Sequence, residues 1–258
     1  MDNVAQYIKE NKDLILNKQY QQFFEYCPTG ITTEVVNTFL TAKINFLPYM
    51  KTITTALFAN DVKLPETFVI PNNIKNIGAL AFYNNKNVKH IVIPESVKSI
   101  EFNAFADCEN LETLELKEGI EILGSNIIQN TWKLKSLTIP ASVTEIDDEC
   151  FYGAQMVTIN FKGKYQSTMK RSTFEECDKL VSIILPEGLN AISVDSFASC
   201  SNLETIHFPS TLKFIATTAF IGCDDIKTIY YDGTKQDWEN KVSCHSPEIN
   251  NVNITFLK

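Results

Sequence analysis

Apolar residues recur along the chain in units of 22 to 24 residues. The pattern is clearest in IVIPESVKSIEFNAFADCENLET (91–113) and IILPEGLNAISVDSFASCSNLET (183–205). The side chains of the first and third residues of each unit point inward from a short strand. The Pro that follows ends the strand because it has no N–H to donate. A single unit cannot bury its apolar positions, whereas stacked units bury them against one another. The pattern therefore predicts a solenoid.

Seven successive units begin at residues 68, 91, 114, 137, 159, 183 and 206. Six of them carry an aromatic anchor, which is Phe82, Phe105, Phe151, Phe174, Phe197 or Phe220. Lys117 and Ile128 replace Pro and Phe in the unit at 114, and Lys162 replaces Pro in the longer unit at 159, where we expect a bulge. The predicted fold class is an α+β repeat solenoid. It forms an arc of about 7–8 rungs with a parallel β-sheet on one face.

The two ends of the chain do not follow the repeat. Residues 1–66 have apolar positions at helical spacing and are expected to form an N-terminal helical cap over the first rung. Residues 67–228 form the repeats. Residues 229–258 form a degenerate last repeat and a C-terminal cap, in which Trp238 packs over the last rung and VNITF (252–256) is a closing strand.

Composition and charge narrow the function. The net charge of -8 and pI of about 5.0 argue against a nucleic-acid partner, because phosphate binding needs clustered Lys and Arg. No apolar run reaches the roughly 18 residues of a membrane span. The first residues, MDNVAQYIKENKDLILNK, lack the apolar core of a signal peptide, so we expect a cytoplasmic protein. If a leader has been removed from this sequence, we instead expect an extracellular or surface protein.

Catalytic and metal-binding motifs are missing from the sequence. It has three histidines and no HExxH, GxSxG, P-loop or GxGxxG motif, so we expect no enzyme, no catalytic residue, no cofactor and no metal. The acidic run at 145–149 is interpreted as a solvated face, with a bound cation or basic partner as the alternative. The basic residues of the unit at 159 are interpreted as surface. They are Lys162, Lys164, Lys170 and Arg171.

Four of the seven cysteines, Cys108, Cys177, Cys200 and Cys223, occupy one position of the repeat. The favoured interpretation is a small apolar residue that fills a buried turn, as free Cys does. The alternative is a stack of thiols that binds metal or forms disulfides.

The segments IPESVKSIEFNAFADCENLETL and LPEGLNAISVDSFASCSNLETI resemble the treponemal, or BspA-like, class of leucine-rich repeats. The resemblance covers about residues 68–232 and implies a parallel sheet, normally on the concave side. The N-terminal segment YIKENKDLILNKQYQQFF, running into these repeats, resembles leucine-rich-repeat proteins encoded by bacteriophages and prophages. That resemblance implies a protein made in a bacterial cytoplasm during infection.

The second residue of each strand points outward on the sheet face. This row reads Val69, Val92, Glu115, Thr138, Asn160, Ile184, His207 and Tyr230. The residues just before each strand are mostly Ser and Thr, which keep a sheet face soluble. The candidate protein-binding residues are Val92, Glu115, Asn160, Ile184, His207 and Tyr230, with Tyr230 as the best anchor. The long unit around 165–171 and the helical cap are competing surfaces.

The sequence thus favours a non-enzymatic, cytosolic scaffold that binds another protein. In the bacteriophage version it inhibits a host protein, such as a defence component. The alternatives are a surface adhesin, a structural virion or assembly component, and a carbohydrate binder, for which the sheet face offers only Tyr230 as an aromatic. An acidic nucleic-acid mimic is disfavoured because the charge is too dilute. No pattern indicates the partner's identity or the oligomeric state.

Overall fold

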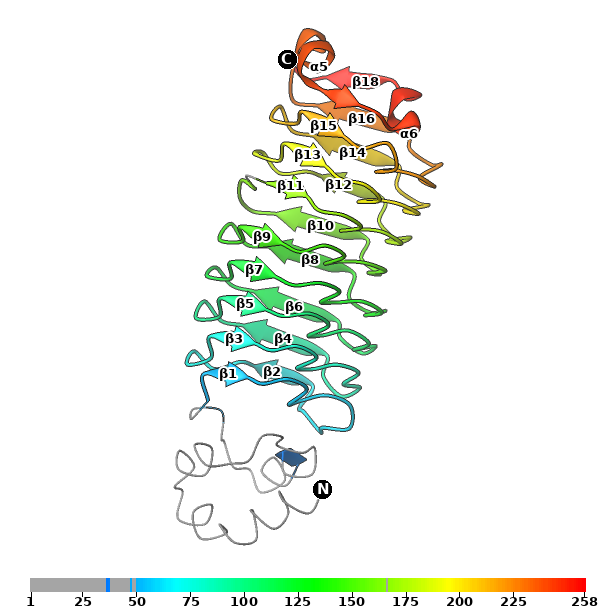
Figure 1. Ribbon diagram of the computed structural model, residues 1–258. Coiled ribbons are helices and arrows are strands. Elements are labelled where there is room, and N and C mark those ends of the chain that lie inside the picture. The colour runs from blue at the N-terminus through cyan, green and yellow to red at the C-terminus, as the bar shows by residue number, and fades with distance from the viewer. Residues whose placement is uncertain (1–35, 38–46, 48–49, 166) are drawn as a thin grey trace, which may run out of the picture.

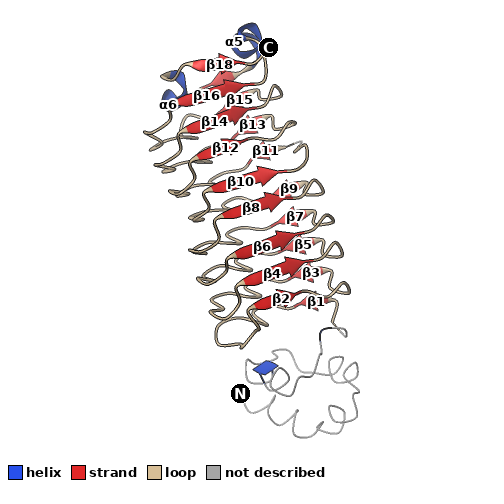
Figure 2. Ribbon diagram, turned by 180° about the vertical axis from the view of Figure 1, so that it is seen from behind, coloured by secondary structure: helices blue, strands red, loops and turns tan. Residues whose placement is uncertain are grey.

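The computed structural model describes residues 36–37, 47, 50–165 and 167–258. These residues form a parallel β-solenoid of about nine turns with few helices (Figure 1). Each turn contributes a long strand and a two-residue short strand, and the two kinds stack in separate columns (Figures 1 and 2). We call their outer surfaces the long-strand face and the short-strand face.

The long strands are β2 (Thr67–Val69), β4 (His90–Ile93), β6 (Thr113–Leu116), β8 (Ser136–Ile139), β10 (Thr158–Phe161), β12 (Ser182–Ile184), β14 (Thr205–Phe208), β16 (Thr228–Tyr231) and β18 (Ile254–Phe256). The short strands are β1 (Thr52–Ile53), β3 (Asn76–Ile77), β5 (Ser99–Ile100), β7 (Ile122–Leu123), β9 (Glu145–Ile146), β11 (Thr168–Met169), β13 (Ala191–Ile192), β15 (Phe214–Ile215) and β17 (Ser243–Cys244). Two short helices, α5 (Lys235–Lys241) and α6 (Pro247–Asn250), lie near the C-terminus.

The described chain has more turns than the 7–8 rungs expected from the sequence. Residues 50–66, which the hydrophobic pattern assigns to the N-terminal cap, contain β1, and β1 pairs in parallel with β3. At the other end, β17 and β18 complete a further turn, so the closing strand is confirmed. The predicted cap helices lie outside the described residues, so the helical cap and the three-part domain division stay predictions.

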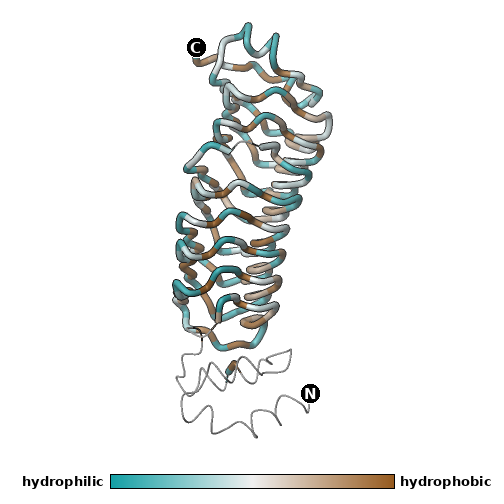
Figure 3. Tube along the Cα trace, turned by 60° about the vertical axis from the view of Figure 1, so that its left-hand side comes forward, coloured by the Kyte–Doolittle hydropathy of each residue, from teal (hydrophilic) through white to brown (hydrophobic). Residues whose placement is uncertain are grey.

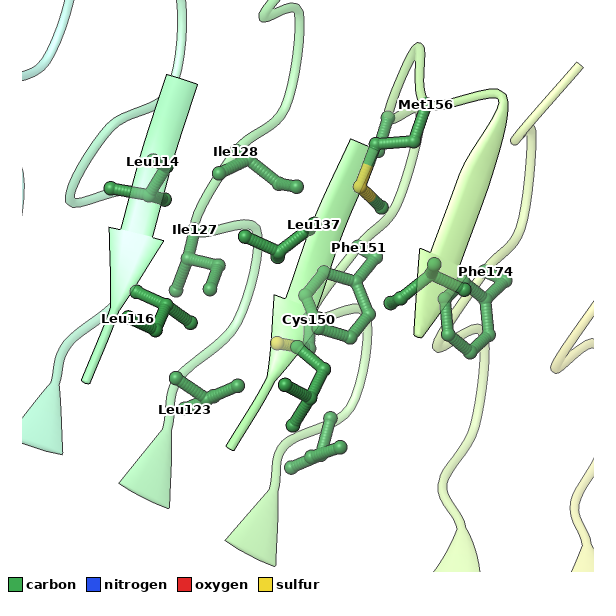
Figure 4. Close-up of a cluster of buried hydrophobic side chains, with 14 of the residues drawn as sticks. Leu114, Leu116, Leu123, Ile127, Ile128, Leu137, Cys150, Phe151, Met156 and Phe174 are labelled. Atoms are coloured by element: carbon green, nitrogen blue, oxygen red, sulfur yellow. The ribbon is translucent and has the colours of Figure 1, made fainter. Parts of the chain in front are cut away.

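A stack of buried phenylalanines runs through the long turns that connect short strands to long strands. Phe151, Phe174, Phe197 and Phe220 are fully buried, and neighbouring rings lie 5.0–5.1 Å apart, centroid to centroid. Ile128 interrupts the stack one turn before Phe151 (Figure 4). The aromatic anchors of the sequence pattern are confirmed. Apolar and polar stretches alternate along each turn in Figure 3.

The recurring cysteines lie beside this stack. The Sγ atoms of Cys108, Cys177, Cys200 and Cys223 donate to the carbonyl oxygens of Phe82, Phe151, Phe174 and Phe197 at 2.9–3.1 Å. Each thiol thus holds the carbonyl of the preceding turn. All four are free thiols, and no metal-binding cluster occurs among the described residues. The buried-turn interpretation is confirmed, with the added role of a hydrogen-bond donor.

The long-strand sheet falls into three ladders. These are β2-β4-β6, β8-β10 and β12-β14-β16-β18. Each interruption follows a unit without Pro. In those units the Lys117 and Lys162 N–H groups donate to Ile93 and Ile139 at 3.1 and 3.0 Å, a bond that Pro cannot make.

The short-strand sheet is interrupted once among the described residues, between β9 and β11. The Ile146 N–H donates to the Tyr165 hydroxyl at 3.1 Å instead of to a backbone carbonyl. Tyr165 is buried, so the expected bulge does not present this ring to a partner. Lys170 Nζ spans the interruption to Glu145 and Asp147 at 3.0 and 2.9 Å. The acidic run therefore already has a basic partner within the chain.

Candidate functional site

The six predicted binding residues all lie on the long-strand face, but the structure divides them among the three ladders. Val92 pairs with Glu115 across β4 and β6. Asn160 pairs with Thr138 across β10 and β8. Ile184, His207 and Tyr230 follow one another across β12, β14 and β16. At about 4.8 Å per strand, Val92 and Tyr230 are roughly 29 Å apart, whereas Ile184 and Tyr230 are roughly 10 Å apart.

Ile184, His207 and Tyr230 form the densest part of the row. Ile184 is 66% exposed, the largest exposed fraction among the large apolar residues of the described chain. The rings of His207 and Tyr230 lie 5.8 Å apart at 54°. His207 Nε2 lies 2.9 Å from Asp232 Oδ1, which fixes the imidazole on this face. We call Ile184, His207 and Tyr230 the C-terminal trio.

The other three predicted residues are less suited to anchor a partner. Val92 is half-buried between Val69 and Glu115. The Glu115 carboxylate pairs with the Lys117 ammonium. Glu115 also lines an open groove of about 410 Å³ at the interruption between β6 and β8. Asn160 is exposed and pairs with Thr138 of the neighbouring strand.

Sequence patterns missed Asp232 and undervalued Val69. Asp232 directly follows β16, where five other units have Pro, and its carboxylate is the partner of His207. The replacement of Pro by Asp at this position is the sequence signal that could have identified Asp232. Val69 stands in the outward row and is 60% exposed.

Charges beside the long-strand face are paired within the chain. Lys89 bridges to Glu66 and Lys227 to Glu204, each at 2.7 Å between successive turns. The hydrogen bond from Lys89, followed by its charge, lowers the pKa of the Glu66 carboxyl. Exposed pairs of this kind contribute little free energy, typically about 0–1 kcal/mol. They keep the face soluble and leave the outward row to provide specificity.

The buried thiols of Cys108 and Cys150 are poor nucleophiles. Burial raises the pKa of Cys108 to about 12 and that of Cys150 well above its ordinary value. The attacking species is the thiolate, so these thiols are unreactive at neutral pH.

No helix among the described residues has the length and apolar character that crossing a membrane requires.

Comparison with models of protein families identifies the family to which this solenoid belongs. The family model described as "BspA type Leucine rich repeat region (6 copies)" matches residues 35–158 and 129–250, which together span most of the chain. The chain belongs to the BspA-type leucine-rich-repeat family. No curated protein matches the sequence.

Solved structures of bacterial leucine-rich-repeat proteins are similar to this BspA-type chain. One from Eubacterium ventriosum is 23% identical with a TM-score of 0.50, and the match covers 75% of this chain and 45% of that one. A Treponema pallidum leucine-rich-repeat protein is 21% identical (TM-score 0.48; 68% and 71% covered). The pneumococcal vaccine antigen PcpA is 18% identical (TM-score 0.49; 80% and 45% covered). The chain thus spans less than half of the first and third of these proteins.

Proposed function

We propose that this protein is a non-enzymatic scaffold that binds another protein through the C-terminal trio. The observation that carries the proposal is the exposure of Ile184 beside a fixed His207 and Tyr230 on one continuous ladder. Tyr is among the side chains that most often dominate binding energy, because it combines apolar area with a polar end. The rigid strands beneath it limit the conformational entropy that binding would cost.

Family membership agrees with this proposal, because leucine-rich-repeat solenoids are in general protein-binding scaffolds. The paired charges around the trio also fit a protein partner. A partly apolar centre surrounded by polar residues is the usual composition of a protein interface.

Two finer versions of the proposal differ in location. In the first, the scaffold acts in a bacterial cytosol and inhibits a host protein during bacteriophage infection. In the second, it acts at a cell surface as an adhesin. The residues that carry the bacteriophage resemblance lie outside the described part of the chain, so we propose the cytosolic version on sequence grounds alone.

The test is affinity capture under reducing conditions, from bacterial cytosol and from host extracellular-matrix extract, followed by mass spectrometry. The bait is the tagged chain, and the variant carries Ile184→Ser and Tyr230→Ser. His207 is left intact because it bonds to Asp232. The matched control carries Phe102→Ser and Val194→Ser, which are also exposed but follow the short strands β5 and β13.

We expect one protein to be retained in stoichiometric amount by the wild type and the control. The trio variant should retain at least tenfold less, with an unchanged melting temperature. Equal retention by the trio variant would refute the site. The extract that yields the partner distinguishes the cytosolic scaffold from the adhesin.

A further inference from the structure

A groove of about 520 Å³ opens on the column of long turns, away from the C-terminal trio. Its lining includes Trp132, Tyr152, Gly153, Gln155, Glu176 and Asp178. We call it the Trp132 groove, and we propose that it is a binding site for a neutral saccharide.

The groove exists because side chains are missing at two neighbouring positions. Other units place two residues between the recurring Cys and the next buried Leu, whereas the unit at 137 has only Gln155 between Ala154 and Met156. Gly153 (φ 62) occupies a left-handed position that Gly222 holds in one other turn and that five other turns fill with a residue bearing a side chain. Those residues are Asn84, Asp107, Asn130, Glu176 and Ser199. A Cβ added at Gly153 would meet only Gln129 Cγ, at 3.8 Å. The turn is therefore recessed between its neighbours.

Two aromatic rings border this recess. Trp132 is 51% exposed. Its position in the other turns is held by small or charged residues, namely Lys86, Glu109, Asp178, Ser201 and Asp224. The fold therefore does not need an aromatic side chain there. Burial, followed by the hydrogen bond to Glu176, raises the pKa of Tyr152 to about 12 and keeps its phenol protonated.

The polar groups of the groove include an unsatisfied acceptor. Gln155 is more than nine-tenths buried and donates one amide N–H to the Gly153 carbonyl at 3.1 Å. Asp178 Oδ2 accepts from Lys179 Nζ at 3.0 Å. The buried Asp178 Oδ1 has no hydrogen-bond partner among the described residues. A buried acceptor without a partner is uncommon in folded proteins, and a ligand hydroxyl could satisfy it only if the Asp178 side chain turned toward the groove.

The chemistry of the lining selects a neutral, hydroxyl-rich ligand. The charges balance, because the lining contains two lysines, Lys135 and Lys179, and two carboxylates, Glu176 and Asp178. Amides and carboxylates supply donors and acceptors for sugar hydroxyls. The electron-rich faces of Trp and Tyr suit the C–H faces of a pyranose ring. The aromatic groups that a carbohydrate site requires therefore lie on the long turns, whereas the sequence pattern directs attention to the sheet face.

The experiment is a titration of the full chain with maltose, cellobiose, lactose and N,N′-diacetylchitobiose, observed by saturation-transfer NMR of the sugar. Trp132→Ser and Gly153→Asn are the test variants. Ser201 and Asn84 hold the equivalent positions in other turns, so both variants should fold. The matched control is Tyr230→Ser, which removes an aromatic ring from the long-strand face.

We expect at least one disaccharide to bind with a dissociation constant on the order of 1 mM. Both groove variants should bind at least tenfold more weakly at an unchanged melting temperature, while the Tyr230→Ser control binds normally. Absence of binding by all four sugars would overturn the proposal, as would equal binding by the groove variants. Binding of tetramethylammonium at Trp132 without any sugar would instead indicate a site for cations. Protein capture by Trp132→Ser should stay normal, which separates this proposal from the proposed function.

Discussion

At the residue scale, the stability of the fold depends on equivalent side chains that have the same buried surroundings in successive turns. Phe197 stacks on Phe174 and Phe220 at 5.1 and 5.0 Å, centroid to centroid, and is fully buried. Because its ring contacts the turns on both sides, its loss would leave a cavity that neither neighbour can fill.

We predict that Phe197→Ala lowers the free energy of unfolding by about 3–5 kcal/mol, measured by urea denaturation. The matched control is Phe102→Ala, whose ring is 51% exposed and which should cost less than about 1 kcal/mol. Equal effects of the two substitutions would contradict the packing described here.

The buried thiols lead to a second prediction. Iodoacetamide at pH 8 should leave Cys108, Cys177, Cys200 and Cys223 unmodified in the native protein, because they are buried and donate to backbone carbonyls. Among the six cysteines of the described residues, Cys244 is only half-buried and should react first. Peptide mapping by mass spectrometry measures each site. Alkylation of Cys108 as fast as Cys244 in the folded state would show that the long turns open readily.

At the element scale, the interruption between β9 and β11 depends on Tyr165. Its hydroxyl takes the Ile146 N–H that would otherwise donate within the ladder. The hydrophobic pattern identifies the unit at 159 as irregular. It does not indicate that the extra residue turns a tyrosine inward, because this depends on a donor in the preceding turn.

Tyr165→Phe should therefore destabilise the fold by about 1–3 kcal/mol, since it leaves a buried N–H without an acceptor. Tyr83→Phe is the control, because the Tyr83 side chain is only half-buried. Urea denaturation of the two variants gives the comparison. A neutral Tyr165→Phe would mean that water or the backbone replaces the hydroxyl.

Helix α5 has a capping box that titrates in acid. The hydrogen bond from Lys241, followed by those from Thr234, lowers the pKa of Asp237 from 3.8 to about 2. A carboxyl with a lowered pKa in the folded state contributes stability that is fully present above about pH 4 and is lost as the pH falls toward 2.

We accordingly expect wild type and Asp237→Asn to differ most in melting temperature above pH 4 and to converge near pH 2. Thermal melts across this range, followed by circular dichroism, provide the measurement. A difference that is constant down to pH 2 would show that the Asp237 charge plays no part in the cap.

At the scale of the whole molecule, the sequence predicts the solenoid because the residue at each buried position packs against the residue at the equivalent position one turn away. It undercounts the turns because residues 50–66 have no Cys, and their Pro65 does not directly follow a strand as the Pro of the repeat does. The division of the candidate face into three ladders and the recess at Gly153 could not be predicted. They depend on which side chains face each other between turns of unequal length, and no single unit contains that information.

The central claim is that a protein partner lies on the C-terminal trio. Hydroxyl-radical footprinting of the complex, read out by mass spectrometry, tests it most directly. We predict a severalfold fall in oxidation of Ile184, His207 and Tyr230, with Phe102 and Val194 oxidised as in the free chain. Unchanged oxidation of the trio, together with protection of Phe102 and Val194, would contradict the account.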